Sequence, residues 1–396
     1  MVRKIRHQGS AELIIVGDAF GLWEITEYER LEKLQWLIES HQDLFNQFLK
    51  TSQTTPITLI PGNHDYELAC YPEFIPVLQQ YGIQLVPEAH IIRTLAGKKI
   101  WIEHGNQHDG FNRFKYYGDP ASTPVGYYIT SQFVGGAGQR SQKGHDHWLK
   151  DIQAVYPTEH IPHWVFSNYF YREMSPLLRY LLLPFLLLFS LSVIVVILSI
   201  IDHQGLLPVN ISELNWLRQI GGIGKLLEWV ILANSTVISF LLLMAIPLFF
   251  IVRDIKATLR RYHLTGHEKA VTEKDCHYYQ AAHNIFNSDP DVHVFVYGHT
   301  HNASLIVEQN RAIINTGTWI KLLSRVSARA RLLPDVYVPS YCLSVFHIKE
   351  EQGKLIICYR SREKKPDRKL TRLQRILTFR RRPKAQPEIP SVTVLD

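Results

Sequence analysis

Cysteine is scarce in this chain. Its 396 residues include four, which lie far apart at Cys70, Cys276, Cys342 and Cys358. No two of them have the spacing of a zinc site or of a redox motif. The cysteines therefore indicate neither a disulfide scaffold nor an oxidising compartment.

Two other features are missing. The first ten residues, MVRKIRHQGS, are polar, which predicts that no cleavable signal peptide opens the chain. The sequence also shows no internal repeat, so we expect no repeat architecture.

An excess of basic residues is confined to one segment. Residues 360–384 hold twelve Lys or Arg against two acidic residues, a local charge of +10, whereas the whole chain carries +7. The remainder therefore carries about −3, so the basicity is no argument for nucleic-acid binding. Apolar residues recur in this segment near helical spacing: Leu370, Leu373, Ile376, Leu377 and Phe379. This pattern is typical of a helix that contacts anionic lipids on a membrane surface, and a disordered basic tail is the alternative. The last residues are expected to be unstructured.

Long hydrophobic runs occur twice. Tyr180–Ile201 and Trp229–Val252 contain no charged residue, and each exceeds the ~20 residues that a helix needs to cross hydrocarbon. Buried core helices are the alternative. We predict a two-helix transmembrane hairpin in which four polar residues of the second helix hydrogen-bond to the first. These residues are Asn234, Ser235, Thr236 and Ser239.

The charges around the runs predict an orientation. Residues 202–228 between the two runs contain few positive charges, whereas both outer flanks are basic. The basic flanking residues are Arg172, Arg179, Arg253, Lys256, Arg260 and Arg261. By the positive-inside rule, both flanks and the domain attached to them face the cytoplasm.

Four short motifs follow strand-like apolar runs. In chain order they are Gly17-Asp18, Gly62-Asn63-His64-Asp65, His104-Gly105 and Gly298-His299-Thr300-His301. Loops at the carboxyl ends of strands are where open α/β sheets bind their ligands. Carboxylate, amide and imidazole groups together suit divalent ions such as Mn, Fe or Zn. Two such ions ~3.5–4 Å apart hydrolyse phosphate esters by in-line attack.

These motifs resemble those of the calcineurin-like metallophosphoesterase family. Residues 14–23, IIVGDAFGLW, are most similar to the second motif of the branch that contains UDP-2,3-diacylglucosamine hydrolase. The resemblance covers roughly residues 11–115 and 265–358. The diacylglucosamine hydrolases usually carry Arg where this chain has His64, so the resemblance is closer to the family than to the branch.

The resemblance implies a role for each motif residue. Asp18 would bridge two divalent ions, Mn first and Fe or Zn as alternatives. Asn63, His104 and His299 would complete one metal site, and His301 would bind the other ion. The catalytic pair would be His64, which assists the leaving oxygen, and Asp65, which orients His64. Arg113 is a candidate for binding the substrate phosphate, although a solvated loop residue is at least as good a description.

One family motif is missing. The family opens with Asp-x-His about one helix before the Gly-Asp motif, and this pair supplies two ligands of the first metal. Only 17 residues precede Asp18, and none of them forms Asp-x-His. We expect either a start codon further upstream or a natural truncation that leaves half a metal site.

The predicted fold class is α/β: a two-sheet metallophosphoesterase sandwich flanked by helices, with the transmembrane hairpin inserted in it. The phosphoesterase domain would comprise residues 1–165 and 263–358, the hairpin 166–262 and the basic tail 359–396. Within the domain, Thr26 and Glu29 have the spacing of a capping box at the start of a helix to about Lys50. Strands are predicted at Ile57–Ile60 and Val292–Tyr297, and a hairpin around Gly97.

The predicted function is a membrane-anchored, two-metal phosphoesterase acting on a phosphate ester or pyrophosphate bond, with a lipid-linked substrate as the first class. Two alternatives remain open. One is a tethered phosphatase or nucleotide phosphodiesterase with a soluble substrate. The other is a membrane protein of impaired activity that keeps the fold for interaction.

Overall fold

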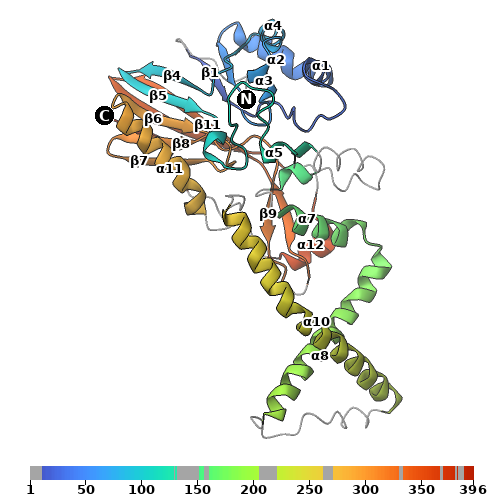
Figure 1. Ribbon diagram of the computed structural model, residues 1–396. Helices are drawn as coiled ribbons and strands as arrows, with labels where there is room; N and C mark the ends of the chain where they lie inside the picture. The colour runs from blue at the N-terminus through green and yellow to red at the C-terminus, as the bar shows by residue number, and fades with distance from the viewer. Residues whose placement is uncertain are drawn as a thin grey trace. The chain divides into compact units, whose positions relative to one another are not determined.

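The chain divides into two compact units. The computed structural model describes residues 11–128, 130–131, 151–155, 160–204, 221–261, 271–329, 333–365, 369–379, 381 and 388–396. Unit 1 comprises Met1–Asn168, Gly266–Arg329 and Asp335–Asp396, and unit 2 comprises Tyr169–Thr265 and Ala330–Pro334. Unit 1 mixes helices with four sheets (Figure 1). The predicted α/β class is therefore confirmed.

The first sheet of unit 1 is parallel. It contains β1 (Leu13–Val16), β2 (Ile57–Ile60) and β3 (Ile83–Leu85), with β2 in the middle. All four residues of β2 are buried, as expected for a β-branched apolar strand inside a parallel sheet. The helices that follow the strands are α1 (Leu31–Ser40), α2 (Gln42–Ser52), α3 (Glu67–Cys70) and α4 (Phe74–Gln80). Leu34, Phe45 and Phe74 pack from α1, α2 and α4 into one core with this sheet.

The second sheet has five strands in the order β4-β5-β6-β8-β7. Their bounds are β4 (His90–Leu95), β5 (Lys98–Glu103), β6 (Val292–Tyr297), β7 (Ser304–Glu308) and β8 (Arg311–Asn315). The predicted hairpin around Gly97 is present as β4–β5, and β5 pairs in parallel with β6 from nearly 200 residues later. Alternate residues of β6 belong to different cores: Phe295 packs with Phe286 of α11 (Val271–Ser288), whereas Val294 and Val296 belong to the core on the other face.

The third sheet completes the second core. It contains β11 (Cys342–Glu351), β12 (Lys354–Glu363) and β13 (Val392–Leu395). Leu355 and Ile357 of β12 share a core with Ile60 of β2 and Val294 of β6, so side chains from three sheets meet there. A two-stranded sheet joins β9 (Leu322–Val326) to β10 (Val336–Ser340). Short helices complete unit 1: α5 (Val125–Tyr128), α7 (Ile161–Asn168) and α12 (Arg372–Leu377).

Two expectations about the ends of elements are wrong. The helix predicted from Thr26 begins only at Leu31, because Arg30 has a φ of 45° and interrupts a helical backbone there. A second break at His41 divides α1 from α2. The last residues are not unstructured, because Val392–Leu395 pairs with β12 as β13 and the side chain of Leu395 is fully buried. Part of the predicted basic tail is therefore sheet.

The segment predicted as a surface helix is short. α12 spans six residues and begins with a capping box between Thr371 and Gln374. Leu377 is buried, and its carbonyl accepts from the backbone N–H of Arg329. Ile376 and Phe379 remain exposed, so only part of the expected apolar face is free for a membrane surface.

Unit 2 consists mainly of two long helices that cross (Figure 1). α8 spans Pro176–His203 and α10 spans Gly222–Arg261. In the part of the chain that the structure describes, one helical segment, Gly222–Ile255, is long and apolar enough to cross a membrane. Among the described residues of the two helices, the predicted polar contact is present at Asn234, which donates to Ser192 Oγ at 3.2 Å, whereas Ser235 and Thr236 donate to carbonyls of their own helix.

Candidate metal centre

The four sequence motifs meet in unit 1. Asp18 follows β1, residues 62–65 follow β2, His104 follows β5 and His299 follows β6. In each sheet the two strands concerned are parallel neighbours, so their carboxyl ends open at the same edge. The backbone N–H of Gly298 donates to the carbonyl of His104 at 2.9 Å, which joins the last two motifs directly.

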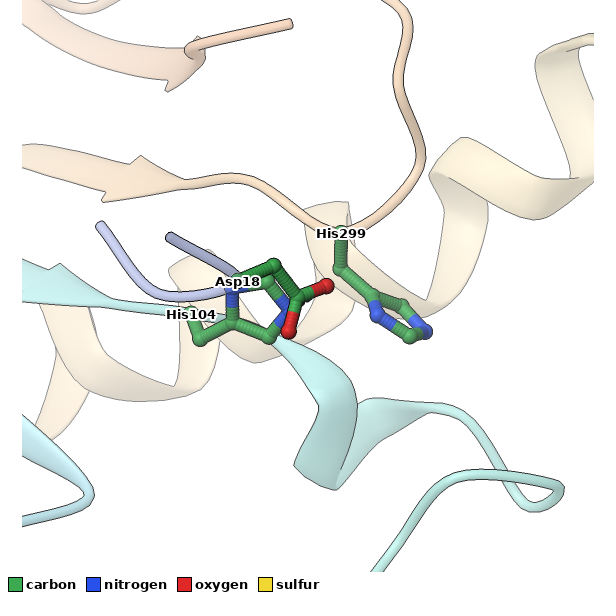
Figure 2. Close-up of side chains that lie close together, drawn as sticks. All are labelled: Asp18, His104 and His299. Carbon is green, nitrogen blue, oxygen red and sulfur yellow. Dashed lines mark ion pairs between the residues drawn. The ribbon is translucent and has the colours of Figure 1, made fainter. Parts of the chain in front are cut away.

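Three side chains converge at this point. Asp18, His104 and His299 each offer a ligand atom, and these atoms lie within 4.8 Å of one another (Figure 2). His104 is buried and the other two are partly buried. A carboxylate and two imidazoles are common ligands of divalent transition metals. The structure therefore brings together three of the five predicted metal ligands.

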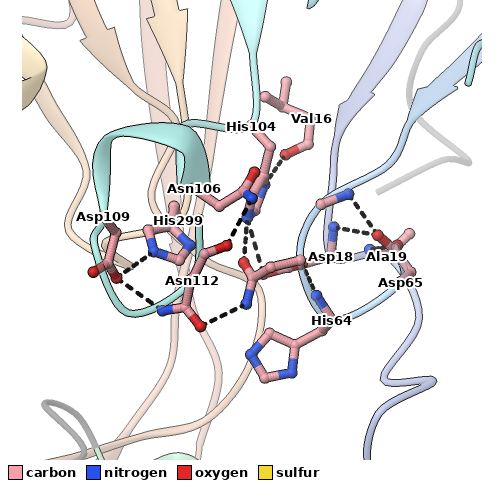
Figure 3. Close-up of polar contacts among 12 residues, drawn as sticks. Val16, Asp18, Ala19, His64, Asp65, His104, Asn106, Asp109, Asn112 and His299 are labelled. Atoms are coloured by element: carbon pink, nitrogen blue, oxygen red, sulfur yellow. Dashed lines mark hydrogen bonds and ion pairs between the residues drawn. The ribbon is translucent and has the colours of Figure 1, made fainter. Parts of the chain in front are cut away.

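The ring of His104 has a defined orientation. Its Nδ1 lies 2.8 Å from the carbonyl oxygen of Val16, which can only accept, so Nδ1 carries a proton. Its Nε2 lies 3.1 Å from Asp18 Oδ2 (Figure 3) and 3.1 Å from Asn63 Oδ1. Both of these oxygens also only accept. Nε2 thus faces two lone-pair-bearing oxygens, and Asn63 joins the cluster as a fourth predicted ligand.

This arrangement demands positive charge. Burial disfavours the charged form of His104, but the carboxylate of Asp18 outweighs it and raises the pKa of the imidazole. Burial likewise acts to raise the pKa of Asp18, yet the imidazoles of His104 and His64 bring it well below its ordinary value. The carboxylate therefore stays ionised inside the protein and needs a proton or a cation beside it.

Three predicted ligands have unusual backbones. Asp18, His299 and His301 have φ values of 51°, 63° and 59°, the left-handed region that L-residues rarely adopt. Such conformations persist only where surrounding contacts require them, and they occur often at functional sites. In this protein they turn the side chains of Asp18 and His299 into the cluster immediately after β1 and β6 end.

Two glycines allow the loops to approach. A Cβ on Gly62 would lie 2.2 Å from Asp18 Oδ1, and a Cβ on Gly17 would lie 2.4 Å from His104 Nδ1. Any side chain at either position would overlap a predicted ligand. The glycine in each motif is thus explained by packing against the site.

Asp65 has a different contact from the one predicted. Its carboxylate accepts backbone N–H groups of Gly62, Asp18, Ala19 and Phe20 at 2.6–3.2 Å and is fully buried. Burial beside Asp18 raises the pKa of Asp65 to about 6, against the effect of these donors. Asp65 therefore fixes the loop that carries Asp18 and does not orient the ring of His64.

Glu24 is the partner of His64. Glu24 Oε1 lies 2.8 Å from His64 Nδ1, and the indole of Trp23 lies against the same ring. Burial acts to lower the pKa of His64, but the carboxylates of Glu24 and Asp18 raise it to about 9. His64 is therefore an imidazolium at neutral pH. The backbone N–H of His64 donates to Asp18 Oδ1 at 2.8 Å, which places it beside the cluster.

A loop after His104 closes the other side of the cluster. Asp109 Oδ2 lies 2.9 Å from His299 Nε2 and accepts from Asn112 Nδ2 at 2.8 Å. Asn112 Oδ1 in turn lies 3.4 Å from Asn63 Nδ2. Polar contacts thus run from His299 through Asp109 and Asn112 to Asn63.

The remaining two predicted residues differ in position. Burial lowers the pKa of His301 to about 3, so His301 is a neutral imidazole. The charge of Asp18 acts to raise this pKa and that of His299 to lower it, so His301 lies near the cluster. It does not belong to the group of three converging ligands. Arg113 is exposed, between Asn112 of the cluster and the buried Phe114, and no contact with another described residue places it at the site.

Sequence reasoning missed Glu24 and Asn112. Neither lies in a motif, and the only local signal for Asn112 is its place in the polar stretch GNQHDGFN after His104. No family model matches this chain, and no curated protein matches its sequence. The geometry of the site is therefore what supports a function.

Proposed function

We propose that this chain is a metal-dependent phosphoesterase anchored to a membrane. The observation that carries the proposal is the convergence on His104 Nε2. With Nδ1 donating to Val16, the Nε2 lone pair of a neutral ring faces Asn63 Oδ1 and Asp18 Oδ2 at 3.1 Å each. Three lone-pair-bearing atoms at this spacing repel one another unless a proton on Nε2 or a metal cation lies among them.

The spacing also fits one ion. An octahedral ion with bonds of about 2.1 Å has neighbouring ligand atoms about 3 Å apart. Asp18, Asn63, His104 and His299 would hold this ion, and Mn is our first choice, with Fe or Zn as alternatives. A second ion would share Asp18 and take His301. When bound, such ions polarise a phosphoryl oxygen and acidify a water molecule.

The chain's own residues supply the other requirements of the reaction. His64 is protonated at neutral pH because Glu24 and Asp18 face it. A cationic imidazole beside the cluster can donate a hydrogen bond to phosphate and a proton to the leaving oxygen. Glu24 keeps the ring in place through Nδ1, which leaves Nε2 for the substrate. Asp65 holds the Asp18 loop rigid through three of its backbone N–H groups, those of Asp18, Ala19 and Phe20.

We also propose the two-sheet sandwich and the inserted transmembrane hairpin that the sequence predicts. The five-stranded sheet shares its core with β1–β3 and β11–β13, as a two-sheet sandwich of the calcineurin-like metallophosphoesterases would.

The long helices support the membrane anchor. α10 exposes large apolar side chains along its length, among them Trp229, Phe240 and Phe249. We propose that α8 and α10 form a transmembrane hairpin whose basic flanks keep unit 1 in the cytoplasm. A site tethered to the bilayer favours a phospholipid or a lipid-linked pyrophosphate as substrate.

One observation favours a second candidate function. The predicted ligand of the second ion, His301, does not belong to the group of three converging ligands. A site with this arrangement would bind its second ion weakly. The chain would then be an interaction protein that keeps the fold with little activity.

Metal content tests the proposal. The full chain is purified in detergent from cells grown with Mn, and bound metal per chain is measured by mass spectrometry. We expect at least one ion, lost in His104→Ala and retained in the matched variant His293→Ala, whose ring hydrogen-bonds to the carbonyl of Asp291 away from the cluster. Hydrolysis of bis(p-nitrophenyl) phosphate by the loaded wild type completes the test. Metal-free wild-type protein would contradict the metal site, and loaded but inactive protein would favour the interaction protein.

A further inference from the structure

The loop that carries Asp109 and Asn112, after β5 and His104, contacts the candidate metal site. These two residues lie outside the four sequence motifs. Asp109 has both carboxylate oxygens engaged by N–H donors. Oδ1 accepts from the backbone N–H of Phe111 at 2.9 Å, and Oδ2 accepts from Asn112 Nδ2 at 2.8 Å and faces His299 Nε2 at 2.9 Å. The side chain of His299 is only 9% exposed, so water does not compete freely for this contact.

The contact decides which nitrogen of His299 carries the proton. A carboxylate accepts and cannot donate, so His299 Nε2 must be the N–H side of the ring. In a neutral imidazole the lone pair is then on Nδ1. Figure 2 shows one ring nitrogen of His299 on the side that faces Asp18 and the other turned away from it. The nitrogen that Asp109 leaves free is thus the one available to the cluster.

We propose that Asp109 is a positioning residue that holds His299 in the tautomer whose Nδ1 lone pair points into the metal centre. The inference rests on the proposed metal site, because the tautomer matters only if Nδ1 binds an ion. Carboxylate partners of ligating histidines fix the ring and raise its basicity, and their loss typically reduces metal affinity ~10–100-fold. Asp109 would act in this way although no sequence motif contains it.

The same loop also orients Asn63. The amide oxygen of Asn112 faces Asn63 Nδ2 at 3.4 Å, which turns Asn63 Oδ1 toward His104. Asn112 is itself held by Asp109 and by Asn106, whose Nδ2 donates to the Asn112 carbonyl at 3.0 Å. A change at Asp109 therefore reaches two proposed ligands, His299 directly and Asn63 through Asn112.

The variant Asp109→Asn separates this role from a merely structural one. The carboxylate accepts from three N–H groups, and an amide of the same shape has one oxygen and adds donors of its own. Of the three partners, only the imidazole of His299 can respond by moving its proton to the other nitrogen. The shape of the turn is kept, whereas the tautomer preference is weakened or inverted.

Two measurements on the full chain in detergent test the proposal. The first is the ¹⁵N spectrum of metal-free protein with labelled histidine, in which the His299 signal is identified by its loss in His299→Gln. The second is the affinity for Mn²⁺, measured from free Mn²⁺ by electron paramagnetic resonance. The matched control is Asp119→Asn, because Asp119 also accepts a backbone N–H in a turn, from Ala121 at 2.9 Å, but has no histidine partner among its described contacts.

We expect wild-type His299 to be protonated on Nε2, and Asp109→Asn to shift the proton toward Nδ1 and to weaken Mn²⁺ binding ~10–100-fold. Asp119→Asn should change neither readout. An Nδ1-protonated His299 in the wild type, or an unchanged tautomer and affinity in Asp109→Asn, would overturn the inference. Failure of the proposed function is a separate result: the wild type would bind no Mn²⁺, while the ¹⁵N spectrum would still report whether Asp109 sets the tautomer.

Discussion

The cluster of polar side chains at the ends of β1, β2, β5 and β6 and the helix pair α8–α10 satisfy their hydrogen-bonding groups in opposite ways. In the cluster, Asn63, Asp65 and His104 are at most 2% exposed, and each has a partner from a distant part of the chain. In the helices, Ser235 and Thr236 donate to carbonyls four residues back. Asn234 to Ser192 is the polar contact between the helices in the part of unit 2 that the structure describes.

The difference shows where backbone strain is needed. A helix satisfies its backbone internally, so an apolar sequence is enough to form it. The cluster instead needs four loops to approach closely, which requires Gly17 and Gly62 and left-handed backbones at Asp18 and His299. Variants of the cluster should therefore have larger effects than variants of the helix pair.

The largest effect is expected for Gly17→Ala. Gly17 has a φ of +73°, and a Cβ there would lie 2.4 Å from His104 Nδ1 and 2.8 Å from the Cα of Gly62. We expect the free energy of unfolding to fall by about 3 kcal/mol, from overpacking added to the cost of positive φ. Any metal bound at the proposed site should be lost as well. Thermal unfolding and metal content measure the two effects.

Gly97→Ala is the matched control for this variant. Gly97 has a φ of +71°, but no atom lies within 4 Å of the position of its Cβ. It should lose only about 1 kcal/mol, the cost of an L-residue at positive φ. Equal losses in the two variants would mean that the close approach at Gly17 is unimportant.

An intermediate effect is expected for Glu24→Gln. The pKa of His64, about 9, lies above the ordinary imidazole value of 6.5 because Glu24 and Asp18 overcome the effect of burial. Protonated His64 therefore stabilises the fold fully below about pH 6.5, and this contribution is lost as the pH rises through 9. Without the Glu24 charge, the free energy of unfolding should fall by about 1–2 kcal/mol at pH 6 and much less at pH 9.5.

Unfolding of wild type and variant across this pH range measures the difference. Glu27→Gln is the control, because Glu27 is exposed in the same loop. A gap between wild type and Glu24→Gln that stays constant from pH 6 to 9.5 would show that Glu24 does not act through the charge of His64.

The smallest effect is expected in the helix pair. Asn234→Ala removes the hydrogen bond to Ser192 Oγ at 3.2 Å. Contacts of this kind between apolar helices contribute about 0.6 kcal/mol on average and up to about 1.7 kcal/mol. Unfolding in mixed micelles of increasing SDS content measures the loss. Thr236→Ala should lose less, because Thr236 bonds to its own helix, and a loss as large as that of Asn234→Ala would contradict the interhelical role.

Local patterns predicted the elements that carry the site. The strands before Asn63 and before Gly298 lie at Ile57–Ile60 and Val292–Tyr297 as expected, because β-branched runs that end in glycine motifs are a local signal. The long helices also form over the two apolar runs. By contrast, the start of α1 was missed, because no local pattern predicts the positive φ of Arg30. The guanidinium of Arg30 lies over the ring of Tyr71, which is a long-range contact.

The hydrogen-bond partners of the site residues were harder to predict from the sequence. Asp18, Asn63, His104 and His299 were predicted to meet, and they do. The partner of His64 was predicted to be its neighbour Asp65 and is instead Glu24, 40 residues away. Adjacent residues in a tight turn point in different directions, and Asp65 turns toward four backbone N–H groups. β13 was also missed, because its pairing with β12 is a long-range contact.

The sequence by itself determined which chemical groups stand at the strand ends and which segments are apolar enough to form long helices. Both depend on residue type and local periodicity. Only the tertiary structure decided the hydrogen-bond partners: Glu24 for His64, Asp109 for His299, and Val16 for His104. These pairs depend on how β1, β2, β5 and β6 align at one edge, and no local pattern encodes the distances between segments that lie 40 to 190 residues apart.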